Sequence, residues 1–290
     1  MSLLPSTTEI LFELGAGDQV VGVTFECDYP PEARQRRIVS TSALPGGLAP
    51  AEIDRLVAQR LAAGEDLYRL DQGALAGLAA DLVVTQDLCA VCAVDVTRVH
   101  DALDYLACTA QVLTIDPHDL TEVLESIRTL GAATATQARA GELVAALSGR
   151  LAAVRERVAG REAVPALVLE WTDPPFAPGH WIPDLVTAAG GECVLGTAGK
   201  PSLRTSWEAV AAAAPAVVVC APCGYGLAES SRLAAAACGA LPPGVPVWAV
   251  DANASFARPG PRLVDGVEAL AAILHPETGP PDPALARRVG

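Results

Sequence analysis

Hydrophobic residues along the chain form two alternating patterns: short apolar runs, and longer stretches with an apolar residue at every third or fourth position. Short apolar runs are typical of buried strands, and the three-to-four spacing is typical of amphipathic helices. Strands that alternate with helices indicate an α/β fold. The predicted strands are 20–24, 82–84, 112–115, 166–169, 217–220 and 247–250, and the predicted helices include 49–61, 181–189, 207–214 and 263–274.

One unusually long helical pattern lies between the two sets of strands. Apolar residues keep a helical spacing from 120 to 158, and no turn-forming Pro-Gly cluster occurs within this stretch. A single helix of this length would be a stiff joint between two Rossmann-like lobes. We therefore predict an N-terminal α/β lobe over 1–118, a helical linker over 119–160, a C-terminal α/β lobe over 161–277 and a loose tail over 278–290.

Composition and charge narrow the functional classes. The 290 residues carry a formal net charge of −14 and a pI of about 4.6, so the chain lacks the basic face that nucleic acids and anionic membranes require. No transmembrane span and no signal peptide are visible, which predicts a cytoplasmic protein, or an extracytoplasmic one if a leader has been removed. A P-loop, a dinucleotide fingerprint and a nucleophile elbow are missing, which disfavours an enzyme.

Four of the eight cysteines follow predicted strands. Cys27 follows the first strand, Cys89 and Cys92 form a C-x-x-C pair after the second, and Cys223 follows the fifth. Ligands of open α/β sheets bind beyond the carboxyl ends of strands, so these thiols are candidates for a zinc site or an iron–sulfur cluster. Two other interpretations stay open: a redox or disulfide pair at Cys89 and Cys92, or cysteines that are buried and inert.

Three further polar side chains are candidates for contact with a ligand. Glu170 follows the strand 166–169, His180 lies in the next loop, and Arg258 belongs to the segment ARPGPR. A carboxylate in such a place orients a ligand or caps the loop. A histidine serves as an axial metal ligand or a hydrogen-bond partner, and an arginine pairs with a ligand carboxylate or phosphate or makes loop contacts.

Three segments carry a resemblance to a known family. They are SLLPSTTEILFELGAGDQVVGVTFECDYPPEA, EWTDPPFAPGHWIPDLVTAAGG and ASFARPGPRLVDGVEAL. They resemble the vitamin B12-binding substrate-binding proteins of ABC importers, a class with two α/β lobes joined by a long helix, which also includes proteins for haem, siderophores and metal ions. The resemblance covers about residues 2–276 and implies a ligand cleft between the lobes.

The resemblance also implies roles for individual residues. Corrinoid-binding members line the cleft with aromatic side chains, a role that falls here on Tyr29, Trp171, Trp181, Tyr225 and Phe256. Members of the class dock onto a membrane permease through one surface glutamate on each lobe. These glutamates correspond to Glu52 and Glu208, for which ordinary solvated helix charges are the alternative interpretation.

Two main hypotheses follow. The first is a receptor for a corrinoid or related metal chelate that works with an ABC permease. The second is a cytoplasmic protein on the same scaffold that holds zinc or an iron–sulfur cluster on Cys27, Cys89, Cys92 and Cys223. This hypothesis includes an enzyme as one alternative. A thiol redox protein that uses Cys89 and Cys92 is a third, weaker hypothesis.

Overall fold

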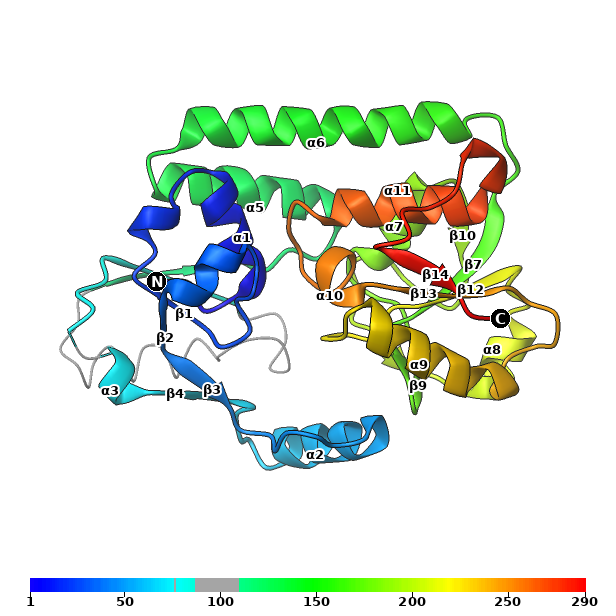
Figure 1. Cartoon of the computed structure of the whole chain (residues 1–290), viewed down its shortest axis with the longest axis horizontal. Coiled ribbons are helices and arrows are strands. Elements are labelled where there is room, and N and C mark those ends of the chain that lie inside the picture. Colours follow the sequence, from blue (N-terminus) through cyan, green and yellow to red (C-terminus); the bar gives the residue numbers. More distant parts are fainter. Residues whose placement is uncertain (76, 87–109) are drawn as a thin grey trace. The chain divides into compact units, whose positions relative to one another are not determined.

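The computed structural model describes residues 1–75, 77–86 and 110–290 (Figure 1). The chain divides into two compact units. Unit 1 consists of Met1–Asp116 and Glu125–Val144, and unit 2 consists of Pro117–Leu124 and Ala145–Gly290. Each unit has its own β-sheet with helices, as the alternating sequence pattern predicts.

Unit 1 is built around parallel strand pairs that meet at Ser2. Strand β1 (Gly22–Val23) pairs with β2 (Arg37–Ile38), and β5 (Leu82–Thr85) pairs with β6 (Gln111–Thr114). Ser2 bridges to Val23 on one side and to Val84 on the other, both in parallel orientation. The first residues of the chain therefore form the middle of this sheet, which brings the carboxyl ends of β1 and β5 to the same edge.

A short antiparallel ribbon and three α-helices also belong to the described part of unit 1. The ribbon consists of β3 (Ser40–Ser42) and β4 (Tyr68–Leu70). The helices are α1 (Pro5–Glu13), α2 (Pro50–Ala62) and α3 (Gln72–Leu75). Apolar side chains from the sheet, the ribbon and α3 form a common core, with the buried members Leu3, Val39, Leu67, Tyr68, Leu75 and Val83. The apolar spacing over 49–61 predicted α2 to within one residue.

The single long helix predicted over 120–158 is wrong in one respect. The structure has two helices, α5 (Leu120–Ala133) and α6 (Gln137–Val158), separated by three residues. Ala135 adopts the left-handed conformation, with φ 57°, and the Thr136 N–H donates to the Gly131 carbonyl at 2.8 Å. This is the hydrogen-bonding pattern of a Schellman helix end. Because alanine occupies the position that usually holds glycine, the sequence contains no signal for the break.

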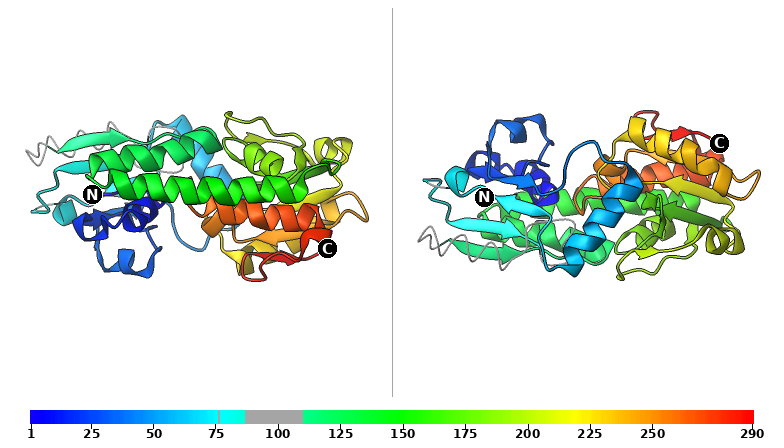
Figure 2. Two further views of the ribbon diagram at one scale, coloured as in Figure 1. Left: turned by 90° about the horizontal axis from the view of Figure 1, so that it is seen from above. Right: turned by 90° about the horizontal axis from the view of Figure 1, so that it is seen from below.

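Helix α6 still connects the two units, since its residues belong to unit 1 up to Val144 and to unit 2 from Ala145. Within unit 1 it runs beside α5 (Figures 1 and 2). Gly131 of α5 lies at a close contact between the two helices, because a Cβ atom there would be 2.5 Å from the Cβ of Ala140.

Replacing Gly131 with alanine is expected to force these helices apart. We expect the free energy of unfolding to fall by about 1–3 kcal/mol, as in other overpacked interiors. The matched control is Gly141→Ala in α6, where a Cβ would have no neighbour within 4 Å. That substitution should raise stability by about 0.5–1 kcal/mol through helix propensity. Urea denaturation measures both changes, and equal effects would contradict the close contact.

Unit 2 contains a five-stranded sheet in the order β10, β7, β12, β13, β14. The first four strands are parallel, and β14 is antiparallel to β13. The bounds are β10 (Gly191–Cys193), β7 (Val164–Leu169), β12 (Val217–Cys220), β13 (Val247–Val250) and β14 (Ala286–Arg288). The prediction of a loose tail over 278–290 is thus wrong, because Ala286 is buried and the backbone of 286–288 pairs with β13. The strand is too short to stand out beside its Pro-rich neighbours.

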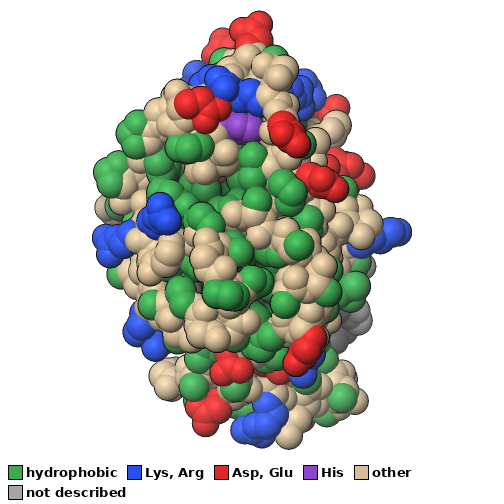
Figure 3. All heavy atoms as spheres, turned by 90° about the vertical axis from the view of Figure 1, so that its right-hand side faces the viewer, with side chains coloured by type: hydrophobic (Ala, Val, Ile, Leu, Met, Phe, Trp, Pro, Cys, Tyr) green, Lys and Arg blue, Asp and Glu red, His purple; other side chains and the backbone are tan. Residues whose placement is uncertain are grey.

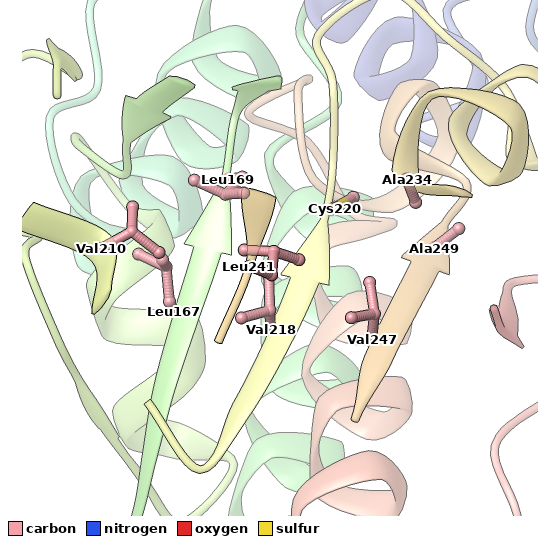
Figure 4. Close-up of a cluster of buried hydrophobic side chains, with 9 residues drawn as sticks. All are labelled: Leu167, Leu169, Val210, Val218, Cys220, Ala234, Leu241, Val247 and Ala249. Atoms are coloured by element: carbon pink, nitrogen blue, oxygen red, sulfur yellow. The ribbon is translucent and has the colours of Figure 1, made fainter. Parts of the chain in front are cut away.

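Helices cover both faces of this sheet. Alternate side chains of β7, β12 and β13 point to one face, where they pack against α8 (Trp207–Ala212) and α9 (Leu227–Ala237) (Figure 4). On the other face α7 (Ile182–Ala188) packs against α11 (Leu263–Leu274). A second, smaller sheet with antiparallel strands in the order β11 (Leu203–Arg204), β9 (Pro175–Ala177), β8 (Trp171–Thr172) follows the carboxyl end of β7.

Candidate functional site

The carboxyl ends of β7, β12 and β13 meet at one edge of the unit 2 sheet, since these strands are parallel neighbours. Backbone hydrogen bonds tie the segments that follow them to one another. The Cys223 N–H donates to the Glu170 carbonyl at 3.1 Å, and the Asn253 N–H donates to the Tyr225 carbonyl at 3.0 Å. The rings of Trp171 and Tyr225 lie 5.7 Å apart, at an angle of 34°. The sequence placed Trp171 and Tyr225 after separate predicted strands, and the structure brings them into contact at this edge.

The small sheet extends this pair into a longer row. Trp171 lies directly opposite Phe176 across β8 and β9, and Phe176 lies opposite Arg204 across β9 and β11. Residues directly opposite each other share one face of a sheet. The guanidinium carbon of Arg204 is 5.8 Å from the centre of the Phe176 ring. We call Tyr225, Trp171 and Phe176 the aromatic row; its rings are half-buried, and the exposed Arg204 stands at its end.

Sequence reasoning missed Phe176 and Arg204 as site residues. Strands of two or three residues have no periodicity to detect. The available signal was Asp173-Pro174, a turn-forming pair between Trp171-Thr172 and Pro175-Phe176, which is typical of a tight connection between antiparallel strands.

Glu170 holds the loops around the row. One carboxylate oxygen, Oε1, accepts from the Gly179 N–H at 2.8 Å, and the other, Oε2, accepts from the Ser202 hydroxyl at 2.8 Å. Glycine is required at 179, because a Cβ would overlap the backbone of Lys200–Ser202. Of the two roles that the sequence left open for Glu170, the described contacts match the loop cap.

His180 lies in one of the two loops that Glu170 joins, and it has a rare backbone conformation. Its φ is 48°, its N–H donates to the Lys200 carbonyl at 2.6 Å, and its carbonyl accepts from the Gly199 N–H at 3.0 Å. Its Nε2 atom is buried and has no hydrogen-bond partner. Burial lowers the pKa of the imidazole below 6.5, and the nearby charge of His118 lowers it further.

This lowered pKa predicts that acid destabilises the protein. The unfolded chain, in which the histidine pKa is about 6.5, binds the proton more readily than the folded chain does. The stability that neutral His180 contributes is therefore complete above pH 6.5 and is lost as the pH falls towards the folded-state pKa. We expect urea denaturation from pH 7 to 5 to show a falling free energy of unfolding. His180→Asn, which tolerates the positive φ, should flatten that slope, and an unchanged slope would contradict the assignment.

Three other predicted site residues lie in the interior of unit 2. Phe256 is 1% exposed and Trp181 is 7% exposed, and the Trp181 indole N–H donates to the Phe256 carbonyl at 2.8 Å. Arg258 is buried as well. Trp181 and Phe256 were predicted to line a ligand surface, whereas in the structure both rings are buried in the interior of unit 2. An aromatic residue beside a strand end can fill the core equally well, and the sequence alone does not separate the two cases.

Unit 1 also carries aromatic side chains beyond a strand end. Tyr29 is 38% exposed and Phe25 is 37% exposed. The Phe25 ring lies 5.9 Å from the ring of Tyr68, whose hydroxyl donates to Glu26 at 3.0 Å. Tyr29 is thus open to solvent on unit 1, as a ligand-contacting residue would be.

The cysteine cluster finds no support in the described residues. Cys27 is buried in unit 1, with its sulfur 3.0 Å from the Thr8 hydroxyl, whereas Cys223 is exposed in unit 2. Residues 1–75, 77–86 and 110–290 contain no group of three His, Cys, Asp or Glu side chains that could hold a metal ion. Cys89 and Cys92 lie outside the described residues, so their metal-binding and redox roles stay predictions.

Two further cysteines of unit 2 have thiols with a raised pKa. Burial raises the pKa of Cys193 to about 11 and that of Cys220 to about 12, so both are protonated thiols at neutral pH. Cys220 belongs to the apolar core of the sheet.

Both predicted docking glutamates occupy the first turn of an exposed helix end. Glu52 is the third residue of α2, and its Oε2 accepts from the Ala49 N–H at 2.9 Å. Glu208 is the second residue of α8 and is exposed. Its own backbone N–H and the Ser206 hydroxyl lower its pKa, which keeps the carboxylate charged. The two units therefore present a carboxylate in similar local settings.

Two apolar features of the described residues lie away from these groups. The face on the right of Figure 1 carries hydrophobic side chains over its middle, with charged side chains around them (Figure 3). A cavity of about 280 Å³ in unit 2 adjoins Val247, the first residue of β13, and Arg288 is the one charged residue of its lining. The cavity therefore lies near the amino end of β13, away from the candidate site at the carboxyl ends of the strands. Most of its lining is apolar. Among the described helices, none is long and apolar enough to cross a membrane.

Comparisons with known proteins agree with this architecture. A relative from Bacillus subtilis (strain 168), described as an uncharacterized ABC transporter substrate-binding lipoprotein, YvrC, is 25% identical over 293 residues, which cover 96% of this chain and 80% of that protein. The periplasmic heme binding protein from Pseudomonas aeruginosa is 19% identical, with a TM-score of 0.73, and the match covers 99% of this chain and 96% of that one. The periplasmic vitamin B12 binding protein BtuF of Vibrio cholerae is 22% identical, with a TM-score of 0.64 and 94% of both chains covered.

These likenesses confirm the predicted α/β fold class and the resemblance drawn from the sequence. The model of the family described as "Periplasmic binding protein" matches residues 1–236, which is most of the chain. The chain belongs to the periplasmic binding protein family.

Proposed function

We propose that this protein is the substrate-binding component of an ABC importer, and that its ligand is a metal chelate of the corrinoid or haem type. The observation that carries the proposal is the aromatic row, because half-buried rings in line offer a flat apolar surface of the kind that a large conjugated ring system requires. The substrate-binding description of the Bacillus subtilis relative supports the importer role, and the haem- and B12-binding descriptions of the two solved structures support the ligand class.

Each unit carries candidate ligand contacts beyond its own strand ends. On unit 2 these are Tyr225, Trp171 and Phe176, with Glu170 and His180 holding the loops around them. On unit 1 the candidate is Tyr29. The lipoprotein description of the relative supports an extracytoplasmic location for this protein.

Titration of the purified protein with cyanocobalamin and with haemin tests the proposal. We expect one of the two to bind in a 1:1 complex with a dissociation constant in the micromolar range or below, detected by calorimetry and by a shift in the visible spectrum. If neither chelate changes either signal, the proposed ligand class is wrong.

The proposed permease contact predicts a charge effect at two positions. Replacing Glu52 and Glu208 together with glutamine removes both charges, while a glutamine side chain at position 52 can still cap α2. We expect the double variant to bind its permease at least tenfold more weakly, which is about 1.4 kcal/mol, and to bind the chelate as before. Glu142→Gln, at an exposed site on α6, is the control. Equal permease affinities for all three proteins would show that the two carboxylates are ordinary solvated charges.

A further inference from the structure

The aromatic row ends at a cation, and this asymmetry bears on the chemistry of the ligand. Arg204 lies directly opposite Phe176 in the small sheet, with its guanidinium carbon 5.8 Å from the ring centre. A guanidinium packed against an aromatic ring presents its N–H groups at its edge, where they match the two oxygens of a carboxylate. The row thus offers an apolar surface and an anion-binding group within one continuous set of side chains.

The segment around Arg204 is locally cationic in a strongly acidic protein. The chain has 34 acidic and 20 basic residues, yet the fifteen residues between Glu192 and Glu208 contain no carboxylate. They contain Arg204 and Lys200, which is the only lysine in the chain, and both are exposed. Since the net charge of −14 repels anions at long range, a local positive segment beside the candidate site favours a ligand with a negative group at that end.

Hydrogen bonds hold this segment in place. Ser202 donates to Glu170, the His180 N–H donates to the Lys200 carbonyl, and β11 pairs with β9. The backbone that carries Arg204 is therefore fixed relative to Trp171 and Phe176. A preorganised cation loses less freedom on binding than one on a mobile loop, which makes a directional contact with a ligand more favourable.

We propose that the ligand is a flat tetrapyrrole-type chelate with at least one free carboxylate, and that Arg204 pairs with this carboxylate while the ring system covers the aromatic row. This inference rests on the proposed function and narrows it. A porphyrin chelate with acidic side chains fits the combination. A fully amidated corrinoid has no carboxylate to offer the guanidinium.

The test compares three probes on wild-type protein and two variants. The probes are haemin, haemin dimethyl ester, which keeps the ring and masks both carboxylates, and cyanocobalamin, whose acid side chains are amidated. The variants are Arg204→Gln and the control Arg232→Gln, at an exposed arginine of α9 that pairs with Glu229. We expect wild-type protein to bind haemin at least tenfold more tightly than the ester. Arg204→Gln should remove that difference by weakening haemin alone, and Arg232→Gln should leave it intact.

The outcomes separate this inference from the proposed function. If cyanocobalamin binds and haemin does not, or if Arg204→Gln weakens haemin and its ester equally or not at all, the inference is wrong and the proposed function stands. If none of the three probes binds the wild-type protein, the proposed function itself fails.

Discussion

Replacing Glu170 with alanine should lower the free energy of unfolding by about 3 kcal/mol. The carboxylate accepts two hydrogen bonds, from the Gly179 N–H and from the Ser202 hydroxyl, each at 2.8 Å. Hydrogen bonds to a charged group contribute about 1.5–3 kcal/mol each when their loss leaves the partners without an acceptor. The loops 177–181 and 199–202 would keep the backbone hydrogen bonds of His180 but lose the carboxylate that joins Gly179 to Ser202. We expect chelate affinity to fall with stability, because Arg204 lies close to the second loop in the chain.

Glu192→Ala is the matched control for this prediction. Glu192 is an exposed glutamate on β10, the edge strand beside β7. Substitutions at such surface sites usually change stability by less than about 0.5 kcal/mol. Urea denaturation followed by tryptophan fluorescence measures both variants. If Glu170→Ala unfolds at the same urea concentration as the control, the carboxylate does not hold the loops together.

Replacing Trp171 with alanine should weaken binding of the chelate about thirtyfold. Trp171 stands in the middle of the aromatic row, between Tyr225 and Phe176, and its indole N–H donates to the Asp173 carbonyl at 3.0 Å, which fixes the plane of the ring. Loss of a preoriented aromatic surface of this size corresponds to about 2 kcal/mol of binding free energy. Isothermal titration with whichever chelate binds the wild-type protein measures the change.

A more conservative substitution separates stacking from folding. Trp171→Phe keeps an aromatic face at the same place, so we expect it to retain affinity to within about fivefold, since a phenyl ring supplies most of the same contact. Thermal denaturation should show both variants folded at the titration temperature. Equal affinity of Trp171→Ala and wild type would show that the ligand does not cover the row.

The sequence predicted the three central strands of the unit 2 sheet, because β7, β12 and β13 are continuous apolar runs whose burial on both faces leaves a clear pattern. It also placed Trp171 and Tyr225 after predicted strands, and in the structure their rings lie 5.7 Å apart. The position of Arg204 beside Phe176 depends on antiparallel pairing of two- and three-residue strands. That pairing depends on tertiary contacts and leaves no local signal.

The misjudged elements share a similar cause. The end of α5 uses an alanine in the left-handed conformation, which side-chain identity does not reveal. Trp181 and Phe256 are aromatic residues near strand ends just as Trp171 is, but both are buried inside unit 2, where the Trp181 indole N–H donates to the Phe256 carbonyl. Only the three-dimensional packing distinguishes rings that fill the interior from rings that face solvent.

The pairing of β14 with β13 has a consequence for how the protein is made. β13 is synthesised more than thirty residues before β14. Its outer edge therefore has no pairing strand until residues 286–288 have been added to the nascent chain. Open strand edges invite pairing with other polypeptides. Residues 286–288 cover this edge by pairing with β13, and we expect a variant that lacks them to expose the edge to pairing with other chains.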